Sequence, residues 1–178
     1  MRPTLFTVDI PGPGRLSTMA KPRAGDWLAD ELTSLRTAGV DVLVCALTPA
    51  ELHEVGLAGE PHAARAAGLE YVSIPIPDRE VPDPSAVLPV LRGLAGRVRE
   101  GAHVVTHCRI GIGRASLLAA GILALNGVPP EQAWPLLERA RGLTVPDTQA
   151  QRAWPAELAA LSGMAGQHIH CRGSVPRP

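Results

Sequence analysis

The segment 107–116, HCRIGIGRAS, joins two apolar runs of the chain. The run before it, Ala102–His107, is typical of a buried strand, and the run after it, Ile112–Asn126, is typical of a buried helix. A strand that passes through a short glycine-containing loop into a helix is a unit of α/β folds, because the helix then packs back on the sheet. Ligands of such folds bind beyond the carboxyl ends of the strands, where this loop begins. The segment therefore constrains both the fold and the place of a binding site.

The rest of the chain also alternates short strands with helices. Further strands are predicted at Leu5–Ile10, Val40–Leu47 and Leu69–Ile76. Further helices are predicted at Ala24–Ala38, from the Thr48-Pro49 cap through Leu52, and at His62–Ala67, Pro84–Arg99, Pro130–Arg141 and Thr148–Leu161. We therefore predict a single three-layer α/β domain over residues 1–162, with a central, mostly parallel sheet of four to five strands and helices on both faces. Residues 163–178 are predicted to form a flexible tail.

Composition narrows the classes of function. The 178 residues carry no formal net charge at pH 7, which gives no support for nucleic-acid binding. No apolar run approaches the roughly 20 residues of a membrane span, and the N-terminus lacks the apolar segment of a secretory signal. Three cysteines are too few for a disulfide framework, and the strong preference for Arg over Lys is typical of GC-rich bacterial genomes. We expect a bacterial, cytoplasmic monomer with no nucleic-acid or membrane partner, no metal and no other cofactor.

The loop has the physical properties of an anion site. Successive N–H groups of a tight loop can converge on one oxyanion, and the N-terminus of the following helix adds partial positive charge. Gly111 and Gly113 permit the positive φ angles that such a loop needs. Arg114 can hold two phosphate oxygens with its planar guanidinium. The same positive field favours the thiolate of Cys108 over the thiol, and a thiolate can attack phosphorus.

These residues match the pattern His-Cys-x5-Arg, the signature of the protein tyrosine phosphatase superfamily. The chain resembles the compact dual-specificity members, including the cyclin-dependent kinase inhibitor phosphatase type and small bacterial relatives. The resemblance implies a dual-specificity phosphatase-like fold and hydrolysis of phosphate monoesters through a phosphocysteine on Cys108. Arg114 would bind phosphate and stabilise the transition state, and His107 would orient the loop by hydrogen bonding. The phosphate would be held by the backbone N–H groups of Arg109, Ile110, Gly111, Ile112, Gly113 and Arg114.

A general acid must protonate the leaving oxygen. Asp78 follows the predicted strand Leu69–Ile76, 30 residues before the cysteine, in a segment that resembles the family's proline-containing acid loop. Asp83 and Glu80 are the alternatives, but Asp83 precedes Pro84 and can instead cap the next helix. We therefore expect Asp78 to be the general acid, and to act as the base towards water in the second step.

Two further residues bear on that second step, in which water attacks the phosphocysteine. The segment 145–154 resembles the family's Glu-Thr-x-x-Gln segment, and on that match Gln151 would position the water. The alternative is that Gln151 is an exposed helix residue. Ala115 stands where most members carry Ser or Thr, whose hydroxyl stabilises the departing thiolate. Hydrolysis of the intermediate is therefore expected to be slow, although the phosphatases of regenerating liver also carry Ala there.

Cys45 lies at the end of the apolar run Val40–Ala46. In some relatives a cysteine at such a strand end forms a protective disulfide with the nucleophile. The resemblance therefore implies Cys45 as a redox partner of Cys108. The alternative is a packed structural thiol.

Other families with a cysteine in an anion cradle fit less well. Low-molecular-weight tyrosine phosphatases and arsenate reductases carry the motif near the N-terminus with the acid downstream, whereas the acid loop here precedes the cysteine. Rhodanese-like sulfurtransferases normally have a shorter cysteine loop. The expected partner is a phosphorylated protein, on tyrosine or on serine and threonine, or a small phosphate ester such as a phosphoinositide. A phosphate-binding module with little turnover is a further alternative, because of Ala115.

Overall fold

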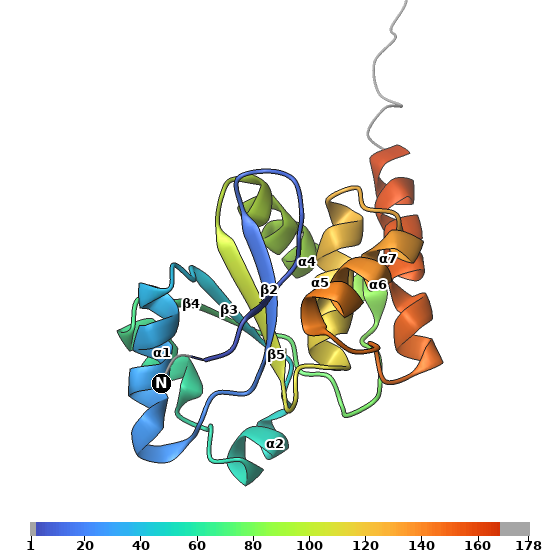
Figure 1. Ribbon diagram of the computed structural model, residues 1–178. Coiled ribbons are helices and arrows are strands. Elements are labelled where there is room, and N and C mark those ends of the chain that lie inside the picture. The colour runs from blue at the N-terminus through green and yellow to red at the C-terminus, as the bar shows by residue number, and fades with distance from the viewer. Residues whose placement is uncertain (1–2, 168–178) are drawn as a thin grey trace, which may run out of the picture.

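Five strands form one mixed sheet in the order β1-β2-β5-β3-β4 (Figure 1). The computed structural model describes residues 3–167. The strands are β1 (Phe6–Thr7), β2 (Arg15–Ala20), β3 (Val42–Cys45), β4 (Glu70–Ser73) and β5 (His103–Cys108). β1 runs antiparallel to β2, and all other neighbouring strands run parallel. The prediction of a mostly parallel sheet of four to five strands is confirmed.

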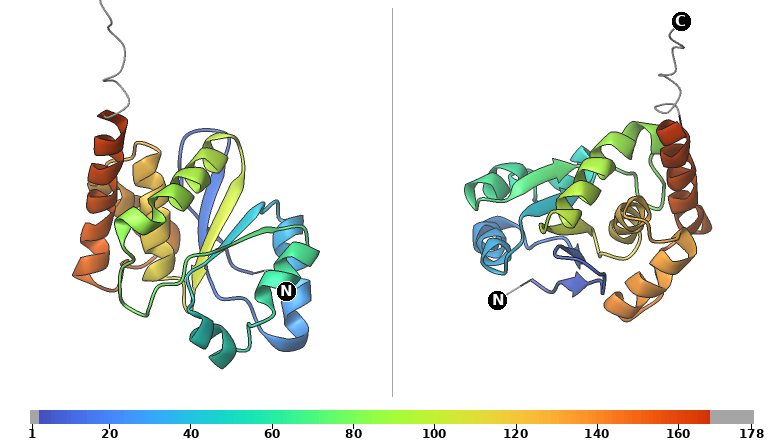
Figure 2. Two further views of the ribbon diagram at one scale, coloured as in Figure 1. Left: turned by 180° about the vertical axis from the view of Figure 1, so that it is seen from behind. Right: turned by 90° about the horizontal axis from the view of Figure 1, so that it is seen from above.

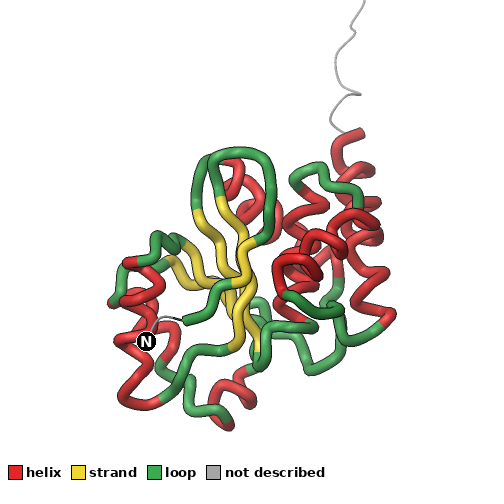
Figure 3. The backbone as a smooth tube through the Cα atoms, viewed as in Figure 1, coloured by secondary structure: helices red, strands yellow, loops and turns green. Residues whose placement is uncertain are grey.

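Helices cover both faces of the sheet, as predicted, and Figure 3 shows the strands at the centre. One layer holds η1 (Gly25–Trp27), α1 (Leu28–Thr37), α2 (Pro49–Glu54) and α3 (Glu60–Ala66). The other layer holds α4 (Pro84–Arg99), α5 (Arg114–Leu125), α6 (Pro130–Arg141) and α7 (Gln149–Gln167) (Figure 2). A separate hydrophobic cluster fills the space on each face. In β3, Val42 and Val44 belong to one cluster, and Leu43 and Cys45 to the other, because side chains alternate along a strand.

The helix α5 is the centre of its layer. All of its residues from Arg114 to Leu123 are buried. The helix packs against β5 and against its three neighbours α4, α6 and α7. Its almost wholly apolar sequence predicts this central position. Because α5 is held on all sides, its N-terminus is fixed at the carboxyl end of β5.

The structure corrects the prediction at the N-terminal end of the sheet. The predicted strand Leu5–Ile10 is reduced to the two residues of β1, and the inner strand β2 is absent from the prediction. The polar residues Ser17 and Thr18 interrupt the apolar pattern that would predict a buried strand, yet both are buried in β2. The Ser17 hydroxyl forms hydrogen bonds of 2.8 Å with Thr7 Oγ1 and with His103 Nε2. A polar residue whose bonds are satisfied in this way is tolerated in a buried strand, and the sequence does not reveal such partners.

Two further boundaries differ from the prediction. The run Leu69–Ile76 predicts a buried strand, whereas β4 lies at the edge of the sheet and is partly exposed. The helix α7 continues to Gln167, past the domain boundary predicted at residue 162. The rest of the predicted tail, residues 168–178, lies outside the described residues. Within residues 3–167, no helix is long and apolar enough to cross a membrane.

Gly14 lies at a close contact between the start of β2 and the end of α4. A methyl group there would collide with the carbonyl oxygen of Val98. We expect Gly14→Ala to lower the free energy of unfolding by about 1–3 kcal/mol, because backbone must move to make room. Gly93→Ala, at an open position of α4, is the control and should raise stability by up to about 1 kcal/mol. Urea unfolding measures both, and equal stabilities of the two variants would contradict the prediction.

Candidate active site

Cys108 is the last residue of β5, and the loop 109–113 leads from it to α5. The N–H of Gly111 donates a hydrogen bond to Cys108 Sγ at 3.3 Å. Gly111 has the expected positive φ of 74°, whereas Gly113 has a φ of −81°. A side chain at Gly113 would collide with the carboxylate of Asp147. Glycine at position 113 therefore makes room for a carboxylate instead of supplying an unusual backbone angle.

Three successive carbonyl groups of the loop are held from outside the cavity. The guanidinium of Arg141 donates to the carbonyls of Ile110, at 3.1 Å, and Gly111, at 3.3 Å. The backbone N–H of Lys21 donates to the carbonyl of Arg109 at 3.3 Å. Within a peptide unit the N–H points opposite to the C=O, so the N–H groups that follow these carbonyls turn inward. The sequence gives no signal for Arg141, because nothing local links the last turn of α6 to this loop.

Arg114, in the first turn of α5, is almost fully buried, with 2% of its side chain exposed. Its guanidinium donates to the two carboxylate oxygens of Glu51 at 2.7 and 2.9 Å, and to the carbonyl of Ile76 at 2.7 Å. Glu51 also completes the capping box of α2 with Thr48. The hydrogen bonds from Arg114 lower the pKa of Glu51 to about 2, against the opposing effect of burial. Glu51 therefore sets the orientation of the arginine, a role that the sequence analysis missed.

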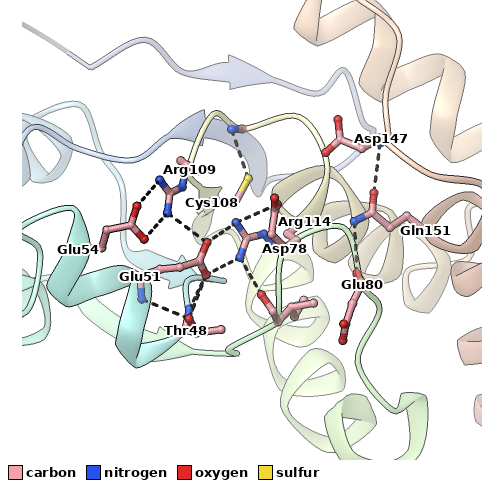
Figure 4. Close-up of polar contacts among 12 residues, drawn as sticks. Thr48, Glu51, Glu54, Asp78, Glu80, Cys108, Arg109, Arg114, Asp147 and Gln151 are labelled. Carbon is pink, nitrogen blue, oxygen red and sulfur yellow. Dashed lines mark hydrogen bonds and ion pairs between the residues drawn. The ribbon is translucent and has the colours of Figure 1, made fainter.

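A second arginine of the loop has the same kind of partner. Arg109 donates to both oxygens of Glu54 at 3.1 Å, and its guanidinium lies 3.7 Å from Glu51 (Figure 4). The hydrogen bonds from Arg109 also lower the pKa of Glu54. The two carboxylates come from adjacent turns of α2, so this short helix pairs with both loop arginines.

Asp78 lines a cavity of about 160 Å³ together with Cys108 and Arg114. Its carboxylate lies 3.4 Å from the Arg114 guanidinium and is 69% exposed. Figure 4 shows Arg114 between Glu51 and Asp78. The next residue, Arg79, has a φ of 65°, which is uncommon for a residue other than glycine, and residues with such strained angles cluster at active sites.

The two alternatives to Asp78 have other contacts. The Asp83 carboxylate caps α4 by accepting a hydrogen bond from the N–H of Ser85 at 2.9 Å. Neither Asp83 nor Glu80 lines the cavity. Of the three carboxylates considered from the sequence, only Asp78 lines the cavity with Cys108.

A carboxylate that the sequence analysis missed, Asp147, lines the same cavity. Gln151 is fully buried, and its side chain accepts from the N–H of Asp147 at 3.2 Å and donates to the carbonyl of Glu80 at 3.3 Å (Figure 4). Thr148 accepts from the N–H of Gln151 at 3.1 Å, as a helix cap does. Gln151 thus joins two loops, and the carboxylate beside it faces the cavity. The signal was present, because Asp147 occupies the Glu position of the Glu-Thr-x-x-Gln segment.

Cys45 and His107 lie away from the cavity. Cys45 belongs to the hydrophobic cluster on the α1 side of the sheet, and Cys108 to the cluster on the α5 side. The sheet separates the two thiols, so the disulfide implied by the resemblance is not prepared by this arrangement. The ring of His107 lies 3.0 Å from the carboxylate of Glu60. Cys45, Glu60 and His107 form the one group of His, Cys, Asp or Glu side chains within the described residues that is close enough to share a metal ion.

The fold and this constellation define a cysteine-dependent phosphatase of the dual-specificity class. Residues 17–128 match the family described as "Tc-R-P: Polymorphic toxin system, DSP-PTPase phosphatase", and the chain belongs to that family. The recognition of a dual-specificity phosphatase from the sequence is confirmed. No curated protein sequence matches the chain.

Solved structures of phosphatases share the fold over most of its length. Kinase associated phosphatase (KAP), with its catalytic cysteine replaced by serine, has a TM-score of 0.76 at 20% identity, covering 90% of this chain and 98% of that one. Tk-PTP in its active form has a TM-score of 0.68 at 27% identity, covering 86% and 96%. PTPMT1 in complex with PI(5)P has a TM-score of 0.69 at 15% identity, covering 85% and 94%.

The contact between Glu51 and Arg114 has a measurable dependence on pH. The pKa of Glu51 is lowered to about 2 in the folded chain. The Glu51 carboxylate therefore makes its full contribution to the free energy of unfolding above its ordinary pKa near 4.5, and this contribution is lost as the pH falls towards 2. We expect Glu51→Gln to lower the free energy of unfolding by about 1–3 kcal/mol at pH 7. The difference from the wild type should narrow as the pH falls below 4.5.

Glu54→Gln is the matched control, because its exposed carboxylate pairs with the exposed Arg109 and should contribute less. Urea unfolding between pH 3 and pH 7 makes the comparison. A Glu51→Gln deficit that is the same at every pH would show that the ion pair is not its cause.

Proposed function

We propose that Cys108, Arg114 and Asp78 hydrolyse phosphate monoesters of proteins in two steps, through a phosphocysteine. The observation that carries this proposal is the convergence on one cavity of the thiol and the guanidinium, from the two ends of the segment 108–114, with the carboxylate of Asp78 from a separate loop. The family supplies the class of reaction. These three side chains have the chemistry of the nucleophile, the partner of the oxyanion and the proton donor that the reaction needs.

In the first step the Cys108 thiolate attacks phosphorus in line with the leaving oxygen. The hydrogen bond from the Gly111 N–H and the N-terminus of α5 stabilise the thiolate. The N–H groups of residues 109–114 and the Arg114 guanidinium hold the three non-bridging oxygens, where charge is concentrated. Asp78 gives its proton to the leaving oxygen, so that an alcohol or a phenol departs.

In the second step water attacks the phosphocysteine, the sulfur–phosphorus bond breaks and the thiolate re-forms. Asp78, now a carboxylate, accepts the proton of the water. We place Asp147 beside that water, because its carboxylate lines the cavity and the amide of Gln151 is already bonded to two backbone groups. Ala115 offers no hydroxyl to the departing thiolate, so this step is expected to limit the rate.

The substrate that we propose is a phosphorylated protein, with phosphate on tyrosine or on serine and threonine. Arg79, Arg109 and Arg114 line the cavity and suit a phosphate dianion. Ile110, 53% exposed, also lines the cavity and offers an apolar contact to the peptide around the phosphorylated residue. A phosphoinositide or another small phosphate ester is the alternative, since three arginines also suit a ligand with more than one phosphate.

We also propose in which system and compartment the enzyme acts. The description of the family places its phosphatases in polymorphic toxin systems, and we propose that the chain acts within such a system. Its nucleophile must remain a free thiol, which suits the reducing cytoplasm. We propose that it acts there as a monomer, and that residues 1–162 with the remainder of α7 form the catalytic domain.

Three variants test the assignment of roles. With phenyl phosphate, whose leaving group needs a proton, we expect Cys108→Ser to abolish turnover and Asp78→Asn to lower kcat by about 10²–10⁴-fold. Asp83→Asn should keep the wild-type rate, because Asp83 only caps α4. The same panel on phosphotyrosine and phosphoserine peptides ranks the substrates. A wild-type rate no higher than that of Cys108→Ser would sink the assignment.

Ala115 is expected to make the second step slow. With p-nitrophenyl phosphate, the wild type should release a burst of about one equivalent of p-nitrophenol and then turn over slowly. Ala115→Ser should raise the steady rate by about 5- to 30-fold, the effect of one added hydrogen bond to the departing thiolate. Stopped-flow absorbance measures both phases. A chain that binds vanadate but shows neither burst nor turnover would instead be a phosphate-binding module.

A further inference from the structure

A buried group of three polar side chains lies on the α3 side of the sheet, away from the cavity. Cys45 ends β3, His107 is its register partner on β5, and Glu60 is the first residue of α3. All three side chains are fully buried. One donor atom of each, a sulfur, a nitrogen and a carboxylate oxygen, lies within 4.8 Å of the other two. The two proposed reaction steps use none of these side chains.

The polar atoms of this group do not satisfy one another. Glu60 Oε1 and His107 Nε2 lie 3.0 Å apart, yet neither atom has a hydrogen-bond partner within residues 3–167, and nor does His107 Nδ1. A buried carboxylate or imidazole without a partner is strongly destabilising, because it has lost its hydration. An ion held between Oε1 and Nε2 would remove this cost at both atoms.

The three donor types suit zinc. Thiolate sulfur, imidazole nitrogen and carboxylate oxygen are the ligands that zinc takes in proteins, whereas calcium and magnesium take oxygen. Donor atoms at roughly 2.0–2.1 Å from a tetrahedral ion lie about 3.3 Å apart. The 3.0 Å between Glu60 Oε1 and His107 Nε2 falls short of this by only about 0.3 Å, which a small side-chain rotation supplies.

The charges of these ligands also balance those of a zinc ion. When the zinc–sulfur bond forms, the thiol of Cys45 gives up its proton to water. The divalent ion then has one thiolate, one carboxylate and one neutral imidazole as ligands, so the site carries no net charge. A site without net charge avoids most of the cost of burying an isolated ion.

Tyr71 of β4 holds the carboxylate from the other side. Its hydroxyl donates to Oε2 of Glu60 at 3.3 Å, while Oε1 lies next to His107. A residue that forms a hydrogen bond to a metal ligand fixes the orientation of that ligand and strengthens the site. Oε2 belongs to the same carboxylate and is the remaining oxygen available for a fourth position.

We propose that Cys45, Glu60 and His107 bind one zinc ion, which joins β3, α3 and β5 on the face of the sheet opposite the cavity. The ligands are buried, so no position of the ion is open to a substrate, and its role is structural. The ion enters as the chain folds, because its ligands come from three elements. The sequence predicts no metal, since these ligands lie far apart along the chain. The proposal is independent of the proposed phosphatase reaction.

The first test is the metal content of the untagged full chain, purified from cells grown with added zinc. The wild type is expected to keep about one zinc ion per chain after dialysis against a chelator. Cys45→Ser, which removes the thiolate at nearly constant size, should lose that ion. A wild-type chain without zinc would overturn the proposal, and so would a Cys45→Ser chain that holds as much zinc as the wild type.

The matched control keeps Cys45 as the one cysteine of the chain. His168, His170 and Cys171 are also residue types that bind zinc, and Cys108 is the other buried thiol of the described part. The double variant Cys108→Ser/Cys171→Ser should therefore keep the full equivalent of zinc. Loss of the ion in this variant would place it elsewhere and overturn the proposal.

Cobalt keeps the proposal testable if Cys45→Ser does not fold. The chain that carries Cys108→Ser and Cys171→Ser is unfolded with a chelator and refolded with cobalt(II) in place of zinc. It should show the near-ultraviolet band of a cobalt–sulfur bond and the visible bands of a tetrahedral ion. Because Cys45 is then the one cysteine left, a refolded chain without the sulfur band would overturn the proposal.

Zinc affinity, measured by competition with a chromophoric chelator, tests the two carboxylate contacts. Tyr71→Phe should weaken binding by about 10–100-fold, because the Glu60 carboxylate loses the group that orients it. Glu60→Gln should weaken binding by more than that. Glu70→Gln, which removes a surface carboxylate of the same strand that pairs with Arg97, should leave the affinity unchanged. Equal affinities of Glu60→Gln and Glu70→Gln would contradict the proposal.

Discussion

The ion pair between Arg114 and Glu51 is the contact on which the site depends. It joins the first turn of α5, in one helix layer, to the first turn of α2, in the other. The guanidinium is buried, so its charge would be strongly destabilising without the carboxylate. The same carboxylate completes the cap of α2. One side chain therefore fixes a helix end and an arginine together, and phosphate meets a guanidinium that is already oriented.

Residues on the two faces of β5 lie in different surroundings. On the α5 side, the loop presents Cys108 to the cavity among arginines and carboxylates. On the α3 side, His107 is enclosed with Glu60 and has no contact with solvent. Because neighbouring residues of a strand point to opposite faces, two consecutive residues can belong to the cavity and to a buried polar cluster. The strand keeps the thiol and the buried contact between His107 and Glu60 at a fixed separation.

The sequence predicted best those features whose causes are local. The bounds of α4 and α6 were predicted to the residue, since each begins with a proline and ends in basic residues before a glycine turn. The loop from Cys108 to Arg114 was recognisable because its nucleophile, glycines and arginine are contiguous. Asp78 was expected at the cavity because it follows a strand in a segment that resembles the family's acid loop, which is also local information.

The features that the sequence did not reveal depend on partners far along the chain. The strand β2 carries buried Ser17, whose partner His103 is 86 residues away. Glu51 and Arg141 reach the loop from α2 and α6, and nothing near either residue marks it as part of a site. Gln151 was left between a water-positioning role and an exposed one, and the structure gives it a third role as a buried link between two loops. Long-range pairing decides each of these, and local pattern cannot show it.

The carboxylates of α2 also bear on how the product leaves. On the proposed function, a phosphate in the cavity takes hydrogen bonds from Arg114 and Arg109, which the glutamates already hold. When phosphate departs, Glu51 and Glu54 again satisfy both guanidinium groups, and no buried charge is left unpaired. The free energy with which inorganic phosphate binds is therefore only the difference between what the arginines gain from phosphate and what they gain from the two glutamates. On the proposed function, the short helix that orients the arginines therefore also weakens product inhibition.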